Sequence, residues 1–485
     1  MEKESQKIDT DFYSRQIGTY GIGTMKKIIK MNIFIYGMRG VGVETAKNIA
    51  LAGPKNITIF DPYIVKINDL TSNFFLTEID IKNGKRRDES CIERLSNLNP
   101  YTNIVIMEGN DIILDIQKKI HEKEFKYDVV IITEFLPNKK IIEIDELCRI
   151  NNIGFIFTCE LGIYGFIFVD FGNEFIIHDK TGEEVKEYLI SSITKEENGK
   201  VFINTDLSGK INDLVSFKEI ERMIELNNCL PRNIKVNKDY VEIGDTSQFS
   251  DYISGGTIFN VKLPKKIKFE SFKERLEEPF KDGEQYNDPL DFLNINIQEV
   301  IHIGILSLFD FYDTKNCLPE INNNKDAEDL LILAKNILEQ KEKDNIYWAK
   351  NIRSNIEEYD ATFDLIFEKN IKNLSNWSRT EICPISSFIG GVTAQEIIKY
   401  SGKYEPIHQW LYLDFSQIVE NLDLKNNDRK ISGSRYDDQI AIFGNEIQKK
   451  LANIECLYII NTLIYKYPYP HYKHQFPLTD DLLPL

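Results

Sequence analysis

The sequence predicts an α/β protein built on a doubly wound sheet that is interrupted by two insertions. Residues 33–61 have the pattern strand, glycine turn, helix and strand, which is the outline of a nucleotide-binding βαβ unit. Strands and helices continue to alternate to about residue 168. A strand-rich stretch and then a helical stretch follow before the α/β pattern returns near residue 380. We therefore expect both middle stretches to be insertions.

The βαβ unit begins with a short apolar run, residues 33–36, of the kind that a strand buried on both faces requires. Glycines follow it at Gly37, Gly40 and Gly42. A helical pattern with a glycine stop leads to a second apolar run that ends at Asp61. Asp61 follows Gly42 by 19 residues, where a ribose-binding carboxylate is expected.

The glycine pattern departs from the phosphate-binding form at its middle position, which is Arg39. A glycine there has no Cβ, so the backbone can close on a phosphate. One interpretation is that the Arg39 guanidinium grips the phosphate itself. The other is that the Cβ and aliphatic side chain of Arg39 fill the space that the nucleotide would occupy. This second interpretation follows directly from the steric role of the glycine that a phosphate-binding turn has at this position.

The composition bounds the class of protein. With 485 residues we expect two to four domains, and 42% hydrophobic residues are enough for globular cores. No uninterrupted apolar run approaches the ~20 residues that a membrane helix needs, and the charged first residues lack a secretory signal. The sequence therefore predicts a soluble intracellular protein. A net charge of −17 argues against general nucleic-acid binding, which needs an excess of Lys and Arg.

The cysteines indicate a reducing compartment. They are odd in number, widely spread and without a C-x-x-C pair, which favours free thiols over a disulfide framework. Their positions are 91, 148, 159, 229, 317, 383 and 456.

The first insertion is predicted between about residues 170 and 270, where the sequence is rich in strand patterns. The residues 197–199, Glu-Asn-Gly, separate two such patterns and predict a hairpin, so we expect a small β-barrel-like unit. The second insertion, at roughly 290–375, is helical. Leu330, Ala334 and Leu338 belong to one apolar stripe there, which predicts a helical bundle.

After the insertions, a helix at residues 387–400 and a strand at 410–415 restore the α/β pattern, and Gly390-Gly391 should let another backbone pack closely. A charged, Asn-rich linker follows. Residues 436–444, YDDQIAIFG, then repeat residues 13–21, YSRQIGTYG, at a constant offset of 423. At that offset Ile460 stands where Gly37 should recur, so the second unit begins and loses its phosphate turn.

Three further groups of residues carry side chains of the kinds found in functional sites. Cys383 precedes a proline like an exposed nucleophile, but no partner lies near it in sequence, so a structural thiol is the simpler interpretation. His471 and His474 have a metal-pair spacing without a close acidic or cysteine ligand, which favours a solvated tail. The short basic run Lys85-Arg86-Arg87 could meet phosphates, but in an acidic chain it predicts a solvated face.

Taken in order, these residues resemble the N-terminal half of the eukaryotic ubiquitin-activating enzyme. The resemblance runs from about residue 12 to 450 and fails beyond about Leu451, so the chain is a fragment, a truncated or misread frame, or one half of a two-chain enzyme. The matching stretches are FYSRQ (12–16), YGMRGVGVETAKNIALAG (36–53), DLTSNFFL (69–76), DTSQFSDYISGG (245–256), VKLPKK (261–266), SSFIGGVTAQEIIKYSGKYEPIHQWLYLDF (386–415) and SRYDDQIAIFG (434–444).

The resemblance implies a Rossmann-like, ThiF-type adenylation domain that is inactive, with a small β-barrel and a helical bundle inserted in it. The adenylation domain would comprise residues 1–168 and 379–422. The β-rich insertion, called the first catalytic-cysteine half-domain in that family, would span 169–270 and the bundle 271–378. Residues 423–485 would hold the linker and the incomplete second adenylation repeat.

The resemblance also implies that Gly37, Gly40, Gly42 and Asp61 form a vestigial nucleotide site, because the family's inactive copy also carries Arg at the position of Arg39. The active copy's phosphate- and magnesium-binding residues are absent. Its Asn and Arg align with Thr71 and Ser72 of this chain. Its Lys aligns with Arg87, and its Asp falls near Thr133. ATP and Mg then belong to the complete enzyme, and we expect this chain alone to bind neither and to hold no metal.

Two classes of function remain open on this basis. The first is half of an enzyme that adenylates the C terminus of ubiquitin with ATP and passes it to a cysteine as a thioester, with the chain inactive alone. The second is a non-catalytic subunit that binds ubiquitin or a partner half, in a two-chain activating enzyme for a ubiquitin-like modifier. Either way the partners are ubiquitin or a modifier like it and an active adenylation half, with no nucleic acid and no membrane. The resemblance places the enzyme in cytoplasm and nucleus.

Arg15 is the residue for which the resemblance implies a catalytic contact. In that family the Arg of the first helix reaches across the interface to the ATP phosphates of the active half. The repeat is consistent with this, because its counterpart is Asp438, so only the first copy carries the cation. The alternative for Arg15 is a surface salt bridge to Asp11 or a nearby Glu.

Overall fold

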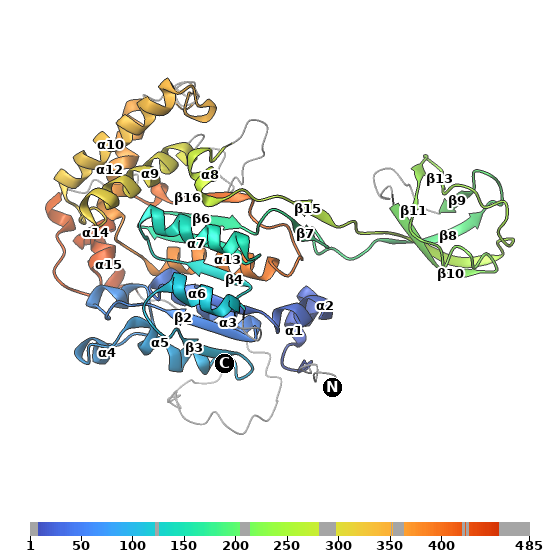
Figure 1. Ribbon diagram of the computed structural model, residues 1–485, viewed down its shortest axis with the longest axis horizontal. Coiled ribbons are helices and arrows are strands. Elements are labelled where there is room, and N and C mark those ends of the chain that lie inside the picture. The colour runs from blue at the N-terminus through green and yellow to red at the C-terminus, as the bar shows by residue number, and fades with distance from the viewer. Residues whose placement is uncertain are drawn as a thin grey trace, which may run out of the picture.

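The computed structural model describes residues 8–121, 126–203, 214–280, 297–350, 352, 363–419, 422 and 426–454. Its body is a seven-stranded sheet with helices packed against it (Figure 1). In spatial order the strands are β16 (Gln409–Asp414), β6 (Tyr164–Asp170), β5 (Gly154–Leu161), β4 (Val129–Ile132), β1 (Asn32–Tyr36), β2 (Asn56–Phe60) and β3 (Asn103–Ile106).

The predicted βαβ unit is confirmed. β1 and β2 pair in parallel through the helix α3 (Gly40–Ala52), and β1 also pairs with β4. Every residue of β1 is buried, as expected of a strand covered on both faces. The prediction of a doubly wound sheet holds only in part, because β6 is antiparallel to both β5 and β16. The sheet is therefore mixed, since β5 returns directly into β6 through a tight turn without a helical crossover.

Helices from distant parts of the sequence complete the body. α13 (Cys383–Lys399) lies beside α3 and contacts β5 and β6. The remaining elements of the body are η1 (Ile67–Thr71), α4 (Glu78–Lys82), α5 (Arg87–Ser96), α6 (Ile112–His121), α7 (Asn138–Ile150), α8 (Phe272–Glu277), η2 (Ser416–Ile418) and η3 (Asn426–Arg429).

The strand-rich insertion forms a separate sheet with its own apolar core. Its order is β11 (Arg232–Asn233), β10 (Leu214–Glu221), β14 (Ser254–Asn260), β8 (Glu187–Ile193), β9 (Lys200–Ile203), β13 (Tyr240–Glu242) and β12 (Lys235–Val236). β8 and β9 pair antiparallel around residues 197–199, so the predicted hairpin is confirmed. Two paired strands, β7 (Phe175–Ile177) and β15 (Lys265–Ile267), join this unit to the body, and the unit stands well apart from it (Figure 1).

The helical insertion contains α9 (Ile297–Lys315), α10 (Asn324–Lys343) and α12 (Phe363–Trp377), which pack on one another. The predicted apolar stripe is confirmed, since Leu330, Ala334 and Leu338 of α10 are buried. Its core is continuous with that of the body. None of the described helices is long and apolar enough to cross a membrane.

The sequence repeat has a structural counterpart. α1 (Ser14–Tyr20) and α2 (Ile22–Ile28) are separated by Gly21, and α14 (Asp437–Phe443) and α15 (Asn445–Ala452) by Gly444. Both glycines adopt a positive φ, 81° and 84°, with ψ of 153° and 163°. This conformation is unfavourable for other residues, so the two glycines build the same corner in each helix pair. Ile460 and the two histidines of the tail lie outside the described residues.

Candidate functional site

The glycine turn between β1 and α3 is closely packed by its own chain. Gly37 has a φ of +95°, and a methyl group on Gly42 would overlap the Gly37 carbonyl. A methyl group on Gly40 would overlap the side chains of Ser72 and Ser386. The three glycines are therefore required sterically, because the turn, the end of η1 and the start of α13 pass within contact distance of one another.

The backbone amides that a phosphate would use already donate to carboxylates of this chain. Gly40 N, at the first turn of α3, donates to Glu381 Oε2 at 2.7 Å. Met38 N donates to Asp61 Oδ2 at 2.8 Å. A helix N-terminus attracts anions, and here the anions are side chains. A nucleotide phosphate could take these amides only by displacing Glu381 and Asp61, so the residues present do not fit a nucleotide.

Arg39 is bound by three carboxylates rather than exposed toward a ligand. Its guanidinium lies 3.5 Å from Glu381, 3.6 Å from Asp69 and 3.6 Å from Asp438. It also donates to the carbonyl of Arg379 at 3.1 Å. The Arg39 side chain is 15% exposed, so these ion pairs are largely sheltered from water. They form because the side chain leaves the turn toward the segment that precedes α13.

Arg87 was predicted to lie on a solvated face, and this prediction is wrong. Its side chain is 7% exposed and forms two hydrogen bonds to Asp69, at 2.9 and 3.1 Å. Its Nη1 lies 3.3 Å from Asp61 and 3.5 Å from Glu134. These partners come from other elements, so the basic run alone gave no sign of them.

Five carboxyl groups thus surround two guanidinium groups in the cluster formed by Arg39, Arg87, Asp61, Asp69, Glu134, Glu381 and Asp438. Burial raises the pKa of Glu134 to about 8 and that of Asp438 to about 7, although both arginines favour the charged form of Glu134 and Arg39 that of Asp438. Burial also raises the pKa of Asp61, against the attraction of Arg87. Part of this acidic excess is therefore protonated near neutral pH.

The two arginines remain charged. Burial disfavours the cation of Arg39, but the nearby carboxylates, Glu381 foremost, outweigh that effect and raise its pKa. The same balance holds for Arg87, whose largest favourable partner is Asp61. The centre of the glycine turn is consequently a fixed arrangement of charges supplied by the chain itself.

Hydroxyl residues stand around the turn. Thr133 Oγ1 donates to the carbonyls of Tyr36 and Gly37, at 2.9 and 3.2 Å. Ser72 Oγ donates to Glu381 at 3.0 Å, and Thr71 Oγ1 donates to the carbonyl of Arg435. Within the part of the chain that the structure describes, no group of three or more His, Cys, Asp or Glu residues is arranged to hold a metal ion.

The contribution of Asp438 was not predicted. It lies in α14, the first helix of the repeat, and is 1% exposed. Its Oδ2 faces Arg39 and accepts a hydrogen bond from Glu381 N at 3.0 Å. The repeat marked Asp438 only as the counterpart of Arg15, and nothing in the sequence placed it beside residue 39.

Arg15 lies elsewhere, on α1, and its side chain is exposed. The described residues offer it no carboxylate within 4.0 Å, so the proposed salt bridge to Asp11 is absent. Arg15 is also not among the ion-pair partners of the charged cluster around the glycine turn.

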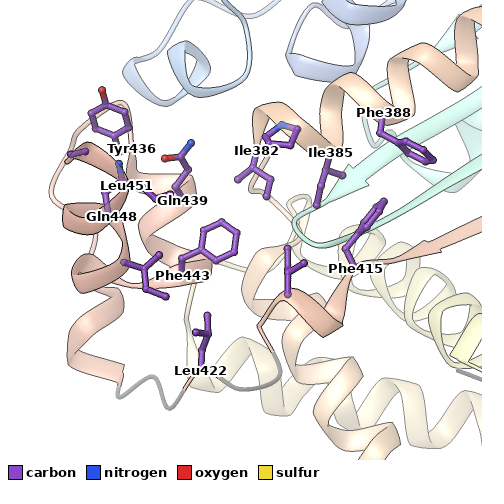
Figure 2. A pocket seen from close by; sticks show the side chains of 14 residues that line it. Ile382, Ile385, Phe388, Phe415, Leu422, Tyr436, Gln439, Phe443, Gln448 and Leu451 are labelled. Atoms are coloured by element: carbon purple, nitrogen blue, oxygen red, sulfur yellow. The ribbon is translucent and has the colours of Figure 1, made fainter. Parts of the chain in front are cut away.

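An apolar groove of about 890 Å³ lies beside the charged cluster. Figure 2 shows Ile382, Ile385, Phe388 and Phe415 on one side of it and Tyr436, Gln439, Phe443 and Leu451 on the other. One wall thus comes from the start of α13 and the end of β16, and the other from α14 and α15. Phe388 on one wall is 48% exposed and Leu451 on the other is 44% exposed, and contiguous exposed apolar surface of this kind is typical of interaction sites.

The remaining sequence predictions have mixed outcomes. Cys383 is partly buried at the start of α13, with its sulfur 4.0 Å from Ser387 Oγ, and its role as a structural thiol stays a prediction. Gly390 allows the predicted close approach, since an added Cβ would lie 2.5 Å from that of Glu44 on α3. Gly391 does not take part, because open space surrounds it.

The ThiF family pattern matches residues 13–431, and the chain therefore belongs to the ThiF family. Among individual proteins, the Ubiquitin-like modifier-activating enzyme 1 of Rattus norvegicus is 35% identical over 453 residues, which are 92% of this chain and 39% of that protein. The Ubiquitin-activating enzyme E1 2 of Arabidopsis thaliana is 33% identical over 456 residues, again 92% of this chain and 39% of that protein. The chain spans about two-fifths of the length of these relatives.

Among solved structures, the E. coli MccB structure with succinimide matches with a TM-score of 0.29 at 19% sequence identity, over 33% of this chain and 49% of that one.

Proposed function

We propose that this chain is the first, non-catalytic half of a ubiquitin-activating enzyme. In this account it does not adenylate ubiquitin itself. It supports a second adenylation half, which binds ATP and Mg, activates the C terminus of ubiquitin and passes it to a cysteine as a thioester. The partners are then ubiquitin and that active half, either later in the same polypeptide or in a separate chain.

The observation that carries this proposal is the occupied glycine turn. Glu381 and Asp61 accept hydrogen bonds from the two backbone amides at the start of α3, where a phosphate would bind. Arg39 replaces the glycine that would let a nucleotide approach. The turn keeps the geometry of a nucleotide site while its anion positions are filled, which is the condition expected of a unit that has lost ATP binding.

The helix pair α14–α15 supports the second part of the proposal. It repeats α1–α2 at the same offset and with the same glycine corner, so it is the beginning of a second unit. This pair forms one wall of the apolar groove. The matched region is only 39% of each of these relatives. A second adenylation half that follows α15 is therefore the occupant that we assign to this groove.

The test is ubiquitin-dependent exchange of pyrophosphate into ATP. Residues 1–452 of this chain would replace the matched region in the rat relative. We expect the chain alone to give no exchange with ubiquitin and the chimera to give it. Exchange by the chain alone would refute the proposal. So would a folded chimera that binds ATP but shows no ubiquitin-dependent exchange.

Arg15 is the proposed catalytic contact to the ATP phosphates of the active half. The repeat supports this, because Asp438, its counterpart, reaches from α14 into the glycine turn of the other unit. By the same geometry α1 would carry Arg15 into the turn of the second unit. A guanidinium there stabilises the negative charge that develops on the leaving pyrophosphate.

We expect Arg15→Ala to lower the exchange rate of the chimera by roughly 100-fold, the loss typical of one such donor. Thermal stability should be unchanged because Arg15 is exposed. Lys26→Ala, which removes an exposed cation from the neighbouring helix α2, is the matched control. Exchange rates for Arg15→Ala within about twofold of wild type would show that Arg15 makes no catalytic contact and is only a surface residue.

A further inference from the structure

Helix α14 is fixed to the body at its first turn by a charged contact. Asp438 Oδ2 lies 3.6 Å from Arg39 Nη2 and accepts from Glu381 N at 3.0 Å. The other ion-pair partners of Arg39 are Glu381 and Asp69. Asp438 is thus joined directly both to the arginine of the glycine turn and to the backbone that carries Glu381. Because the whole arrangement is buried, each charge depends on the others.

Hydrogen bonds to backbone carbonyls also hold α14 and the segment just before it. The carbonyl of Ala441 accepts from Trp377 Nε1 at 3.0 Å and from Asn322 Nδ2 at 3.4 Å. Just before the helix, Arg435 donates to the carbonyl of Leu70 at 2.7 Å. These bonds hold α14 and the segment before it to the helical insertion and to η1, while Asp438 joins its first turn to Arg39.

The two copies of the repeat carry opposite charges at the same position, and the acidic copy faces Arg39. The first helix pair carries Arg15 where the second carries Asp438. The first glycine turn carries the cation Arg39 where a phosphate-binding turn has glycine. A carboxylate on α14 therefore meets the arginine in the turn. The backbone amides of the turn are occupied by Glu381, from the segment before α13, and by Asp61.

We propose that the former nucleotide turn has become a socket for the first helix of the second unit, with Arg39 as the positioning residue and the carboxylate of Asp438 as its ligand. The socket fixes α14, and through α14 it fixes one wall of the apolar groove. Only this last consequence, the placement of a second half, rests on the proposed function. The docking of α14 is a property of the chain by itself.

Hydrogen exchange of the full chain at pH 8 tests the socket. The amides of Ile440 and Gly444, bonded within and just after α14, report whether the helix stays docked. We expect Arg39→Met and Asp438→Asn each to speed their exchange roughly tenfold or more, because each removes a partner of a buried charge. Arg39→Lys should restore part of the protection. Glu446→Gln, an exposed acid on α15, should leave exchange unchanged.

The double variant separates a specific contact from general loosening. If Arg39 acts through Asp438, Arg39→Met should add little to the effect of Asp438→Asn. Independent effects that multiply in the double variant, or single variants within about twofold of wild type, would overturn the proposal. If Arg39→Met fails to fold, Asp438→Asn decides the matter, because it keeps the side-chain volume and an acceptor for Glu381 N. Failure of the proposed function looks different: the chimera lacks exchange activity while α14 remains protected.

Discussion

At the scale of single residues, Arg87 is the group on which the buried charges depend most. Asp61 and Asp69 are 0% and 1% exposed, and Arg87 contacts both, at 3.3 and 2.9 Å. Buried ion pairs add little net stability, but removing one partner leaves an uncompensated charge in a poorly solvated site. The two aspartates therefore make Arg87 a structural requirement rather than a residue for binding phosphate.

We expect Arg87→Met to lower the free energy of unfolding of the body by roughly 3–5 kcal/mol. Urea unfolding followed by tryptophan fluorescence is a suitable measurement, because the three tryptophans, Trp348, Trp377 and Trp410, lie in the body and the helical insertion. Lys85→Met is the control from the same basic run. Its ion pair to Asp80 is 47% exposed on the lysine side, so a change of about 0–1 kcal/mol is expected. Equal effects of the two variants would contradict this interpretation.

Glu134 gives the cluster a pH dependence. Its pKa in the folded state, about 8, is above the ordinary 4.5. The folded protein therefore binds this proton more tightly than the unfolded chain, and the resulting stability is fully present below pH 4.5 and is lost as pH rises through about 8. Asp438 acts in the same direction with a pKa of about 7.

Glu134→Gln should therefore flatten the decline of Tm between pH 6 and pH 9. We expect the wild type to lose at least about 2 °C more than the variant over this interval. Differential scanning fluorimetry in matched buffers measures this. Glu78→Gln, at the start of α4 and exposed, is the control and should follow the wild type. A Glu134→Gln curve parallel to wild type would show that Glu134 does not bind the proton.

At the scale of elements, the contact between α3 and α13 closes the body. α3 begins at the glycine turn near residue 40 and α13 at residue 383, so their packing brings Glu381 to the amide of Gly40. Gly390 permits this approach, since any Cβ there would lie 3.0 Å from the backbone nitrogen of Thr45. The position of the carboxylate in the turn is thus a consequence of helix packing.

Two neighbouring glycines of α13 offer a matched test of this packing. Gly390→Ala should destabilise the body by about 1–3 kcal/mol, because backbone and side chain of α3 must shift. Gly391→Ala meets open space and should stabilise it by about 0.5–1 kcal/mol, through better helix propensity. Urea unfolding of both variants measures the difference. Similar stabilities for the two would mean that the helices pack loosely at Gly390.

The elements that could be predicted from the sequence are those set by local patterns, and the features that depend on long-range pairing could not be predicted. The β1–α3–β2 unit, the hairpin of the first insertion and the stripe of α10 follow from short apolar periods and turn residues. The antiparallel pairing of β6 with β16 joins residues about 240 apart, so no local pattern could reveal it. Asp61 could be predicted at the site because it belongs to the local βαβ pattern. Glu381 and Asp438 could not, because they reach the turn from distant parts of the sequence.

At the scale of the whole molecule, three separate parts of the chain supply the residues around the glycine turn. The sheet and α3 hold the glycines, the segment after the helical insertion supplies Glu381, and the beginning of the second unit supplies Asp438. The barrel-like insertion stands apart on β7 and β15 and contributes nothing to this cluster (Figure 1). The chain thus fills its glycine turn with its own carboxylates and presents the apolar groove beside it.

Titration of Mg-ATP into the purified chain by calorimetry tests the central claim most directly, which is that the glycine turn is filled by carboxylates of the chain itself. The account predicts no saturable heat at millimolar nucleotide, because ATP phosphates would have to displace Glu381 and Asp61 from the amides of Gly40 and Met38. A stoichiometric site of micromolar affinity that is abolished by Asp61→Ala would contradict it.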